Sequence, residues 1–156
     1  MGQPRVLTES ISRTLEPAGF KMKSDSWYQS HTETVLVLNL QKSSHSRQYY
    51  MNIAIWLKAF GQEETPRENK CHIRFRIEEL CPDEEEHVGR ILNLEDASIS
   101  EAERALEIKS LVADHALNFF SRVSTLEGIR QVIRTDPWLK DFVLAKGRAI
   151  LDVNGR

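Results

Sequence analysis

Hydrophobic and polar residues alternate in two long runs in the first half of the chain. Residues 34–41 (TVLVLNLQ) and 49–57 (YYMNIAIWL) place an apolar side chain at nearly every second position, which is the pattern of a β-strand with one buried face. The residues between the runs, KSSHSR, have the composition of a turn. We therefore predict an antiparallel hairpin.

Shorter segments of the same kind flank this hairpin. GFKMK and SWYQSH, separated by the turn residues Ser24 and Asp25, predict two short strands before it, and CHIRFRIEEL predicts one after it. The polar stretch 59–70 predicts an exposed loop. Because these connections are too short for crossover helices, we expect an antiparallel meander of four or five strands.

Helical spacing appears on both sides of the predicted sheet. Leu7, Ile11 and Leu15 predict an N-terminal helix that ends near Pro17 and Gly19. Four signals predict helix starts further on: Pro82 before the acidic run 83–86, the capping boxes Ser100–Glu103 and Ser124–Glu127, and Asp136–Pro137. The longest of these helices is expected from Ser100 to Ser121.

These elements predict an α+β fold in a single domain, residues 1–156. Residues 1–80 form the N-terminal helix and the meander, and residues 81–156 are mostly helical. One sheet face is expected to be a continuous apolar wall that the helices cover. Its residues are Leu36, Leu38, Leu40, Met51, Ile53, Ile55, Ile73, Phe75 and Ile77.

The opposite sheet face begins apolar and becomes polar toward the 42–48 loop. If that loop sets the hairpin register, Asn39 lies opposite Asn52, and Gln41 lies opposite Tyr50. An arginine of the next strand then extends the polar row. The candidate binding residues are Asn39, Gln41, Ser43, Tyr50, Asn52, Trp56, Arg74 and Arg76. Such donors suit a carboxylate, a phosphate or a peptide backbone. However, the solvated face of an antiparallel sheet is expected to be polar even where it binds nothing.

The distribution of charge limits the partners. The net charge is −2, and residues 63–107 hold fourteen acidic against six basic side chains. An acidic middle without a dense Lys/Arg cluster argues against nucleic acid. No stretch approaches ~18 apolar residues, so we expect no membrane span. The N-terminus lacks a signal-peptide pattern, and the two cysteines read as free thiols, so we predict a cytoplasmic protein.

Familiar catalytic and metal motifs are missing from the sequence. There is no C-x-x-C or H-E-x-x-H spacing, no G-x-S-x-G elbow and no glycine-rich phosphate loop. Cys71 and His72 would face opposite sides of one strand. We predict no catalytic residue, no metal site and no cofactor.

Four segments resemble a bacterial family, domain of unknown function 4304 (DUF4304). They are GFKMKSDSWYQ, NLQKS, YYMNIAI and CHIRFRIEEL, and the likeness is best over about the first 80 residues. The resemblance implies a bacterial cytoplasmic α+β protein without an assigned activity. The positions that recur in the family map onto Gly19, Phe20, Trp27, Gln41, Ser43, Asn52 and either Arg74 or Arg76.

Three functional hypotheses follow. The first is a non-catalytic interaction module, of inhibitor type or similar, which holds an unknown protein partner on the polar face or the acidic middle. The second is recognition of a small anionic ligand by the polar face. The third is an enzyme of unrecognised type. The sequence does not indicate an oligomeric state.

Overall fold

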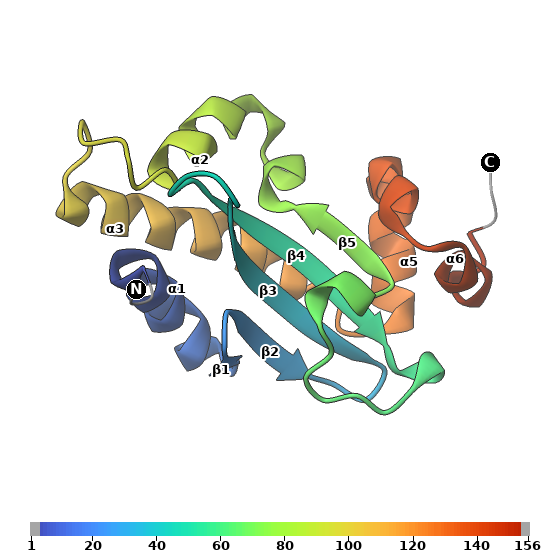
Figure 1. Ribbon diagram of the computed structural model, residues 1–156. Coiled ribbons are helices and arrows are strands. Elements are labelled where there is room, and N and C mark those ends of the chain that lie inside the picture. Colours follow the sequence, from blue (N-terminus) through green and yellow to red (C-terminus); the bar gives the residue numbers. More distant parts are fainter. Residues whose placement is uncertain (1–3, 154–156) are drawn as a thin grey trace.

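The centre of the protein is a five-stranded antiparallel sheet in which each strand pairs with the next one along the chain (Figure 1). The structure is a computed structural model that describes residues 4–153. The strands are β1 Lys21–Lys23, β2 Ser26–Ser30, β3 Thr34–Lys42, β4 Tyr49–Leu57 and β5 Ile73–Arg76. This order confirms the predicted meander.

The hairpin register is also as predicted. Asn39 pairs with Asn52, and Gln41 pairs with Tyr50. The predicted last strand is too long, however, because Ile77–Leu80 forms a 3-10 helix. Ile77 is still fully buried, so the alternation continues past the point where strand pairing stops. The alternation of apolar residues predicts which side chains are buried, but it does not predict where the backbone pairs with another strand.

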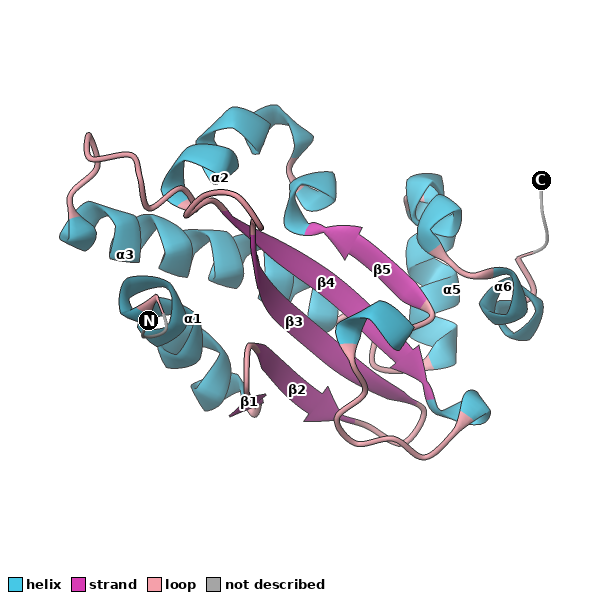
Figure 2. Cartoon of the chain, viewed as in Figure 1, coloured by secondary structure: helices cyan, strands magenta, loops and turns pink. Residues whose placement is uncertain are grey.

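The helices surround one side of the sheet (Figure 2). They are α1 Arg5–Leu15, α2 Glu85–Ile91, α3 Glu101–Leu111, α4 Asn118–Phe120, α5 Leu126–Thr135 and α6 Ala145–Leu151. The 3-10 segments are Glu16–Ala18, Lys58–Phe60, Glu68–Lys70, Ile77–Leu80, Pro82–Glu84 and Pro137–Phe142. Gly19, at φ 99°, ends the N-terminal helical segment, because glycine adopts this left-handed conformation without steric cost.

Two of the predicted helices differ from the structure in their details. Ser100 caps α3 as expected, since its Oγ accepts a hydrogen bond from the Glu103 amide at 3.1 Å. The long helix then passes through a π-helical segment, Val112–Leu117, before α4, which the sequence did not predict. The next cap is Thr125 and not Ser124, because the Thr125 Oγ1 accepts from the Gly128 amide at 3.0 Å.

The predicted last helix is in fact two segments. Pro137–Phe142 is a 3-10 helix, and α6 begins only at Ala145. Between them the chain runs along the edge of β5, where Val143 bridges to Ile73 and the Leu144 amide donates to the His72 carbonyl at 2.8 Å. These backbone bonds at the sheet edge interrupt the helix.

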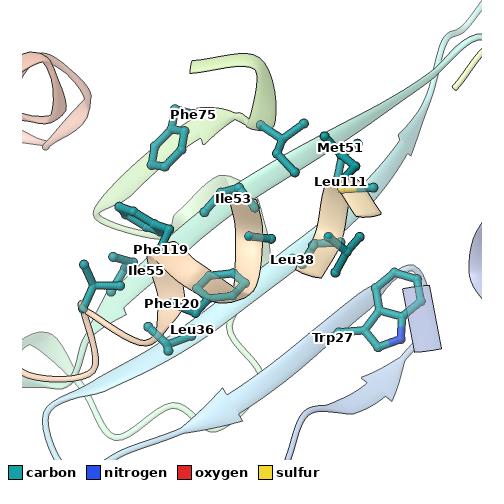
Figure 3. Close-up of a cluster of buried hydrophobic side chains, with 14 of the residues drawn as sticks. Trp27, Leu36, Leu38, Met51, Ile53, Ile55, Phe75, Leu111, Phe119 and Phe120 are labelled. Carbon is teal, nitrogen blue, oxygen red and sulfur yellow. The ribbon is translucent and has the colours of Figure 1, made fainter. Parts of the chain in front are cut away.

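The helices cover the predicted apolar face. Figure 3 shows Phe119, Phe120 and Leu111 packed against side chains of β3 and β4. The Phe75 ring meets the Phe119 and Trp138 rings edge-on, with centroids 5.2 Å apart in each pair. The nine wall residues are all buried, and burial of each large apolar side chain contributes about 1.5–3 kcal/mol.

The other sheet face is covered at one end only. The segment after β4, residues 58–72, crosses in front of the strands (Figure 1). Beneath it a small apolar cluster forms, made of Val35, Val37, Ala54 and Cys71. The prediction of a simply exposed 59–70 loop is wrong at Pro66, which is buried. The apolar end of this face needs a cover, and we call residues 58–72 the covering segment.

Candidate functional site

A cleft lies between the polar part of the sheet face and the covering segment. Its volume is about 770 Å³, which falls within the range of small-molecule sites, roughly 300–1,000 Å³. Three chain regions line it: the β1–β2 hairpin, the polar end of β3 with β5, and the covering segment. The lining residues are Lys23, Ser24, Asp25, Ser26, Tyr28, Asn39, Gln41, Thr65, Arg67, Glu68, Asn69 and Arg74.

A chain of amide hydrogen bonds fixes one wall of this cleft. Asn52, which is only 6% exposed, donates through Nδ2 to Asn39 Oδ1 and to Gln41 Oε1, both at 2.9 Å. Asn39 Nδ2 in turn donates to Ser26 Oγ at 3.0 Å. Asn52 engages both amide oxygens, and Asn39 Nδ2 donates to Ser26 and also to the Asp25 carbonyl at 3.5 Å. Within residues 4–153 the Gln41 NH2 group is thus the amide donor of this network that has no protein partner. The network therefore fixes Gln41 in the cleft lining with its NH2 group left for a ligand.

Two side-chain contacts at the cleft tie the covering segment to the sheet. Arg74 donates two hydrogen bonds to Glu68, from Nε to Oε2 at 2.8 Å and from Nη2 to Oε1 at 3.3 Å. Guanidinium and carboxylate groups favour such two-point contacts. The hydrogen bond from Glu68 raises the pKa of Arg74. On the other side, Lys23 Nζ donates to Thr65 Oγ1 at 3.3 Å. The two contacts tie opposite walls of the cleft together.

The charges of the cleft lining favour an anion. Lys23, Arg67 and Arg74 stand against Asp25 and Glu68, an excess of one positive charge. Arg74 and Glu68 are paired with each other. Among residues 4–153 the Arg67 side chain has no ion-pair or hydrogen-bond partner. Arg67 is therefore the lining cation with the greatest freedom to meet a ligand.

Some predicted site residues lie beside the cleft. Arg76 pairs with Asn52 across the strands, and its guanidinium carbon is 3.8 Å from the centroid of the Tyr50 ring. Such cation–π stacking contributes about 0.5–1 kcal/mol at an exposed site. Tyr50 and Arg76 thus extend the polar row beyond the cleft lining.

Two predicted residues lie elsewhere. Ser43 belongs to the β3–β4 turn, where its Oγ accepts from the His45 amide at 3.2 Å. Trp56 lies at the opposite end of its strand, and its Nε1 donates to the Gly61 carbonyl at 2.8 Å. The structure thus brings Asn39, Gln41, Asn52 and Arg74 together, and it does not bring Ser43 or Trp56 to them.

Nine of the twelve lining residues were not among the candidates from the sequence. Ser26 pairs with Asn39 in the sheet, so the alternation of β2 could have identified Ser26 and Tyr28 as members of the same face. Burial raises the pKa of Tyr28. Lys23 pairs with Ser26 and could have been identified in the same way, whereas Arg67 had no such signal because it reaches the site through a long loop.

His72 is a buried histidine outside the cleft lining. Its Nδ1 accepts from the Leu57 amide at 2.9 Å, and its ring lies 4.5 Å from the Trp56 ring and 4.6 Å from the Phe60 ring. Burial, followed by the charge of Lys146, lowers the pKa of His72 to about 4. It is a neutral packing residue at pH 7.

Among residues 4–153, the cleft lining includes no histidine, the most frequent general base, and no cysteine. One group of potential metal ligands exists in the described part of the chain, formed by Cys81, Glu84 and His115. It shares no residue with the cleft. Across residues 4–153, no helix is both long and apolar enough to cross a membrane.

Fold and site together define an α+β protein with a meander sheet, helices on its apolar face and a polar cleft on the other. The family model "Domain of unknown function (DUF4304)" matches residues 11–122, well over half of the chain. The protein belongs to this family, which confirms the resemblance seen in the sequence. The match takes in the whole sheet and the cleft, while α5 and α6 lie beyond it. No curated protein and no solved structure gives a significant match.

Proposed function

We propose that this protein is a non-catalytic binding protein whose cleft holds a small molecule with a carboxylate or phosphate group. The observation that carries the proposal is the amide network of Asn52, Asn39 and Gln41, which fixes the Gln41 NH2 group in the cleft lining beside an excess of positive charge. Hydrogen bonds from charged or oriented donors to an anion are about twice as strong as neutral ones.

The shape of this face favours a small ligand over a protein partner. A stable protein interface buries roughly 800 Å² on each partner, and such a surface is better served by an open sheet face. Here the covering segment crosses that face and recesses its polar residues in a cleft of about 770 Å³. A protein partner, which is the first hypothesis from the sequence, could contact only the rim of the cleft and the acidic surface.

Binding is also favoured over catalysis. The lining combines amides, hydroxyls, lysine, arginine and two carboxylates, without an imidazole or thiol. The arginine on β5 is held by Glu68, which suits a rigid receptor. The cytoplasmic location remains a prediction from the sequence.

The proposal can be tested by comparing two charge-neutralising variants of one loop. Arg67 lines the cleft and Lys70 does not, although both are exposed. We expect inorganic phosphate, a mononucleotide or a small dicarboxylate to raise the unfolding midpoint of the wild type. Arg67→Gln should weaken that ligand by about tenfold or more, because a hydrogen bond to a charged group contributes about 1.5–3 kcal/mol. Lys70→Gln should leave the affinity unchanged.

The measurement is isothermal titration calorimetry of the three proteins with each ligand that shifts the midpoint. The proposal fails if no anion shifts the midpoint at millimolar concentration, or if Arg67→Gln and Lys70→Gln bind alike. A stoichiometric protein recovered from native lysate by wild type and Arg67→Gln equally, without any anion effect, would favour the interaction module instead.

A further inference from the structure

Three side chains with different donor atoms meet on the helical side of the protein. The Cys81 thiol, a Glu84 carboxylate oxygen and a His115 ring nitrogen all lie within 4.8 Å of one another. Within this group, His115 Nε2 and Glu84 Oε2 are 3.2 Å apart. Sulfur, nitrogen and oxygen donors in one place form a ligand set that borderline-soft divalent metals accept.

The local backbone explains how these residues meet. The Glu84 amide donates to the Cys81 carbonyl at 2.8 Å, and this tight turn after β5 brings positions 81 and 84 close together. His115 belongs to the π-helical segment Val112–Leu117 between α3 and α4. A π-helical turn is rare, and it is found frequently at functional sites because it rotates side chains out of the α-helical order.

We propose that Cys81, Glu84 and His115 form a binding site for one zinc ion. Zinc prefers four ligands in a tetrahedron at about 2.0–2.3 Å, which places neighbouring donor atoms roughly 3.3–3.8 Å apart. The present spacing needs only small side-chain rotations to reach that geometry. Three protein ligands leave a fourth position for water or for Asp114, which lines the adjoining recess of about 90 Å³.

The surroundings of the thiol support a cation. The carboxylates of Glu84 and Glu78 lie near the Cys81 thiol, whose Sγ donates to the Ile77 carbonyl at 3.6 Å. Zinc binding would replace the thiol proton, which passes to solvent, and would offset the nearby negative charge. Without a metal, the half-exposed pair of His115 and Glu84 contributes only about 0–1 kcal/mol.

This site could not be read from the sequence. Cys81 and Glu84 lie about thirty positions before His115, and no short ligand spacing connects them. Cys71 and His72, the cysteine and histidine named above, are not part of this group, and the structure brings Cys81 to His115 instead. The juxtaposition depends on how the turn after β5 packs against the π-helical segment.

The test is metal binding by the full chain, freed of metal with a chelator and then returned to chelator-free buffer. Competition with a chromophoric chelator should show one equivalent of Zn²⁺ bound. Co²⁺ in its place should give the near-ultraviolet charge-transfer band of a cobalt thiolate. Glu84→Gln and His115→Gln, both solvent-accessible, should each weaken zinc by tenfold or more, since even supporting residues of metal sites contribute 10–100-fold.

Three further variants separate this site from the other thiol and from the scattered histidines. Cys81→Ser should abolish the cobalt band, while Cys71→Ser and the exposed-loop variant His45→Gln should keep it. Circular dichroism verifies the fold of every variant. The proposal is overturned if the folded wild type binds no stoichiometric zinc at micromolar concentration. It is equally overturned if Glu84→Gln and His115→Gln bind as tightly as the wild type.

Discussion

The two faces of the sheet start from the same alternation and end in opposite roles. On one face, three strands present an unbroken apolar surface that helices cover completely. On the other, a small apolar cluster lies at one end under the covering segment, and the polar remainder opens into a cleft of about 770 Å³. The apolar face is buried on folding, and the other face leaves polar groups accessible to a ligand.

The difference arises from the kind of contact each face makes. Apolar packing is not directional and scales with area, so helices of varied sequence can satisfy the inner wall. Amide and guanidinium contacts are directional, and each donor or acceptor takes few partners. Asn52 uses its NH2 group on Asn39 and Gln41, and this arrangement fixes the Gln41 NH2 group at the cleft without filling the space in front of it. Stability and binding are therefore divided between the faces.

Truncation on the apolar face should have the largest effect on stability. Ile53 is fully buried at the centre of β4. Ile53→Ala should lower the free energy of unfolding by about 2–5 kcal/mol, because the lost methyl groups leave a cavity. Urea denaturation followed by circular dichroism measures this change. A loss below about 1 kcal/mol would show that the wall is loosely packed.

The buried His72 side chain, which packs against Trp56, should make stability depend on pH. The pKa of His72 is about 4 in the folded chain, against its ordinary value of 6.5. As pH falls below 6.5, the unfolded chain binds a proton that the folded chain refuses, so stability decreases until about pH 4 and then levels off. The loss is on the order of 3 kcal/mol.

Urea denaturation of wild type and His72→Gln between pH 7 and pH 4 isolates this contribution. Burial and Lys58 also lower the pKa of His31, and that effect remains in both proteins. The variant should show a clearly shallower pH dependence. Parallel curves for the two proteins would contradict a buried neutral His72.

Removal of the Asn52 amide should have a moderate effect on stability and a larger effect on anion binding in the cleft. Asn52→Ala leaves the Asn39 and Gln41 oxygens without their donor, and both residues can recruit water. We expect a loss of about 1 kcal/mol, together with loss of anion binding. Chemical denaturation and calorimetry measure the two quantities. A decrease in the free energy of unfolding as large as that expected for Ile53→Ala would mean that this face also serves as core.

The contact between Glu68 and Arg74 should have the smallest effect. The Arg74 side chain is 44% exposed, and exposed ion pairs contribute about 0–1 kcal/mol. Glu68→Gln should therefore change global stability little but speed hydrogen exchange in residues 61–70. Glu63→Gln, an exposed change in the same segment, is the control and should change neither. Slower exchange in Glu68→Gln would contradict the role of this pair in holding the covering segment.

The sequence predicted what periodicity encodes and missed what tertiary contacts decide. The meander, the apolar wall and the pairing of Asn39 with Asn52 follow from alternation and a short turn. The covering segment could not be placed, because its polar composition hides the buried Pro66. The split of the last helix results from backbone bonds to β5. Arg67 reaches the site through a loop, whose path no periodic pattern specifies.

The division of roles between the faces is tested most directly by a ¹H–¹⁵N NMR titration with inorganic phosphate and citrate. The account predicts saturable shifts of backbone amides in residues 23–28 and 65–69, the two walls that flank the amide network. These shifts should be lost in Arg67→Gln and retained in Lys70→Gln. Shifts that do not saturate, or that fall outside these two walls, would contradict it.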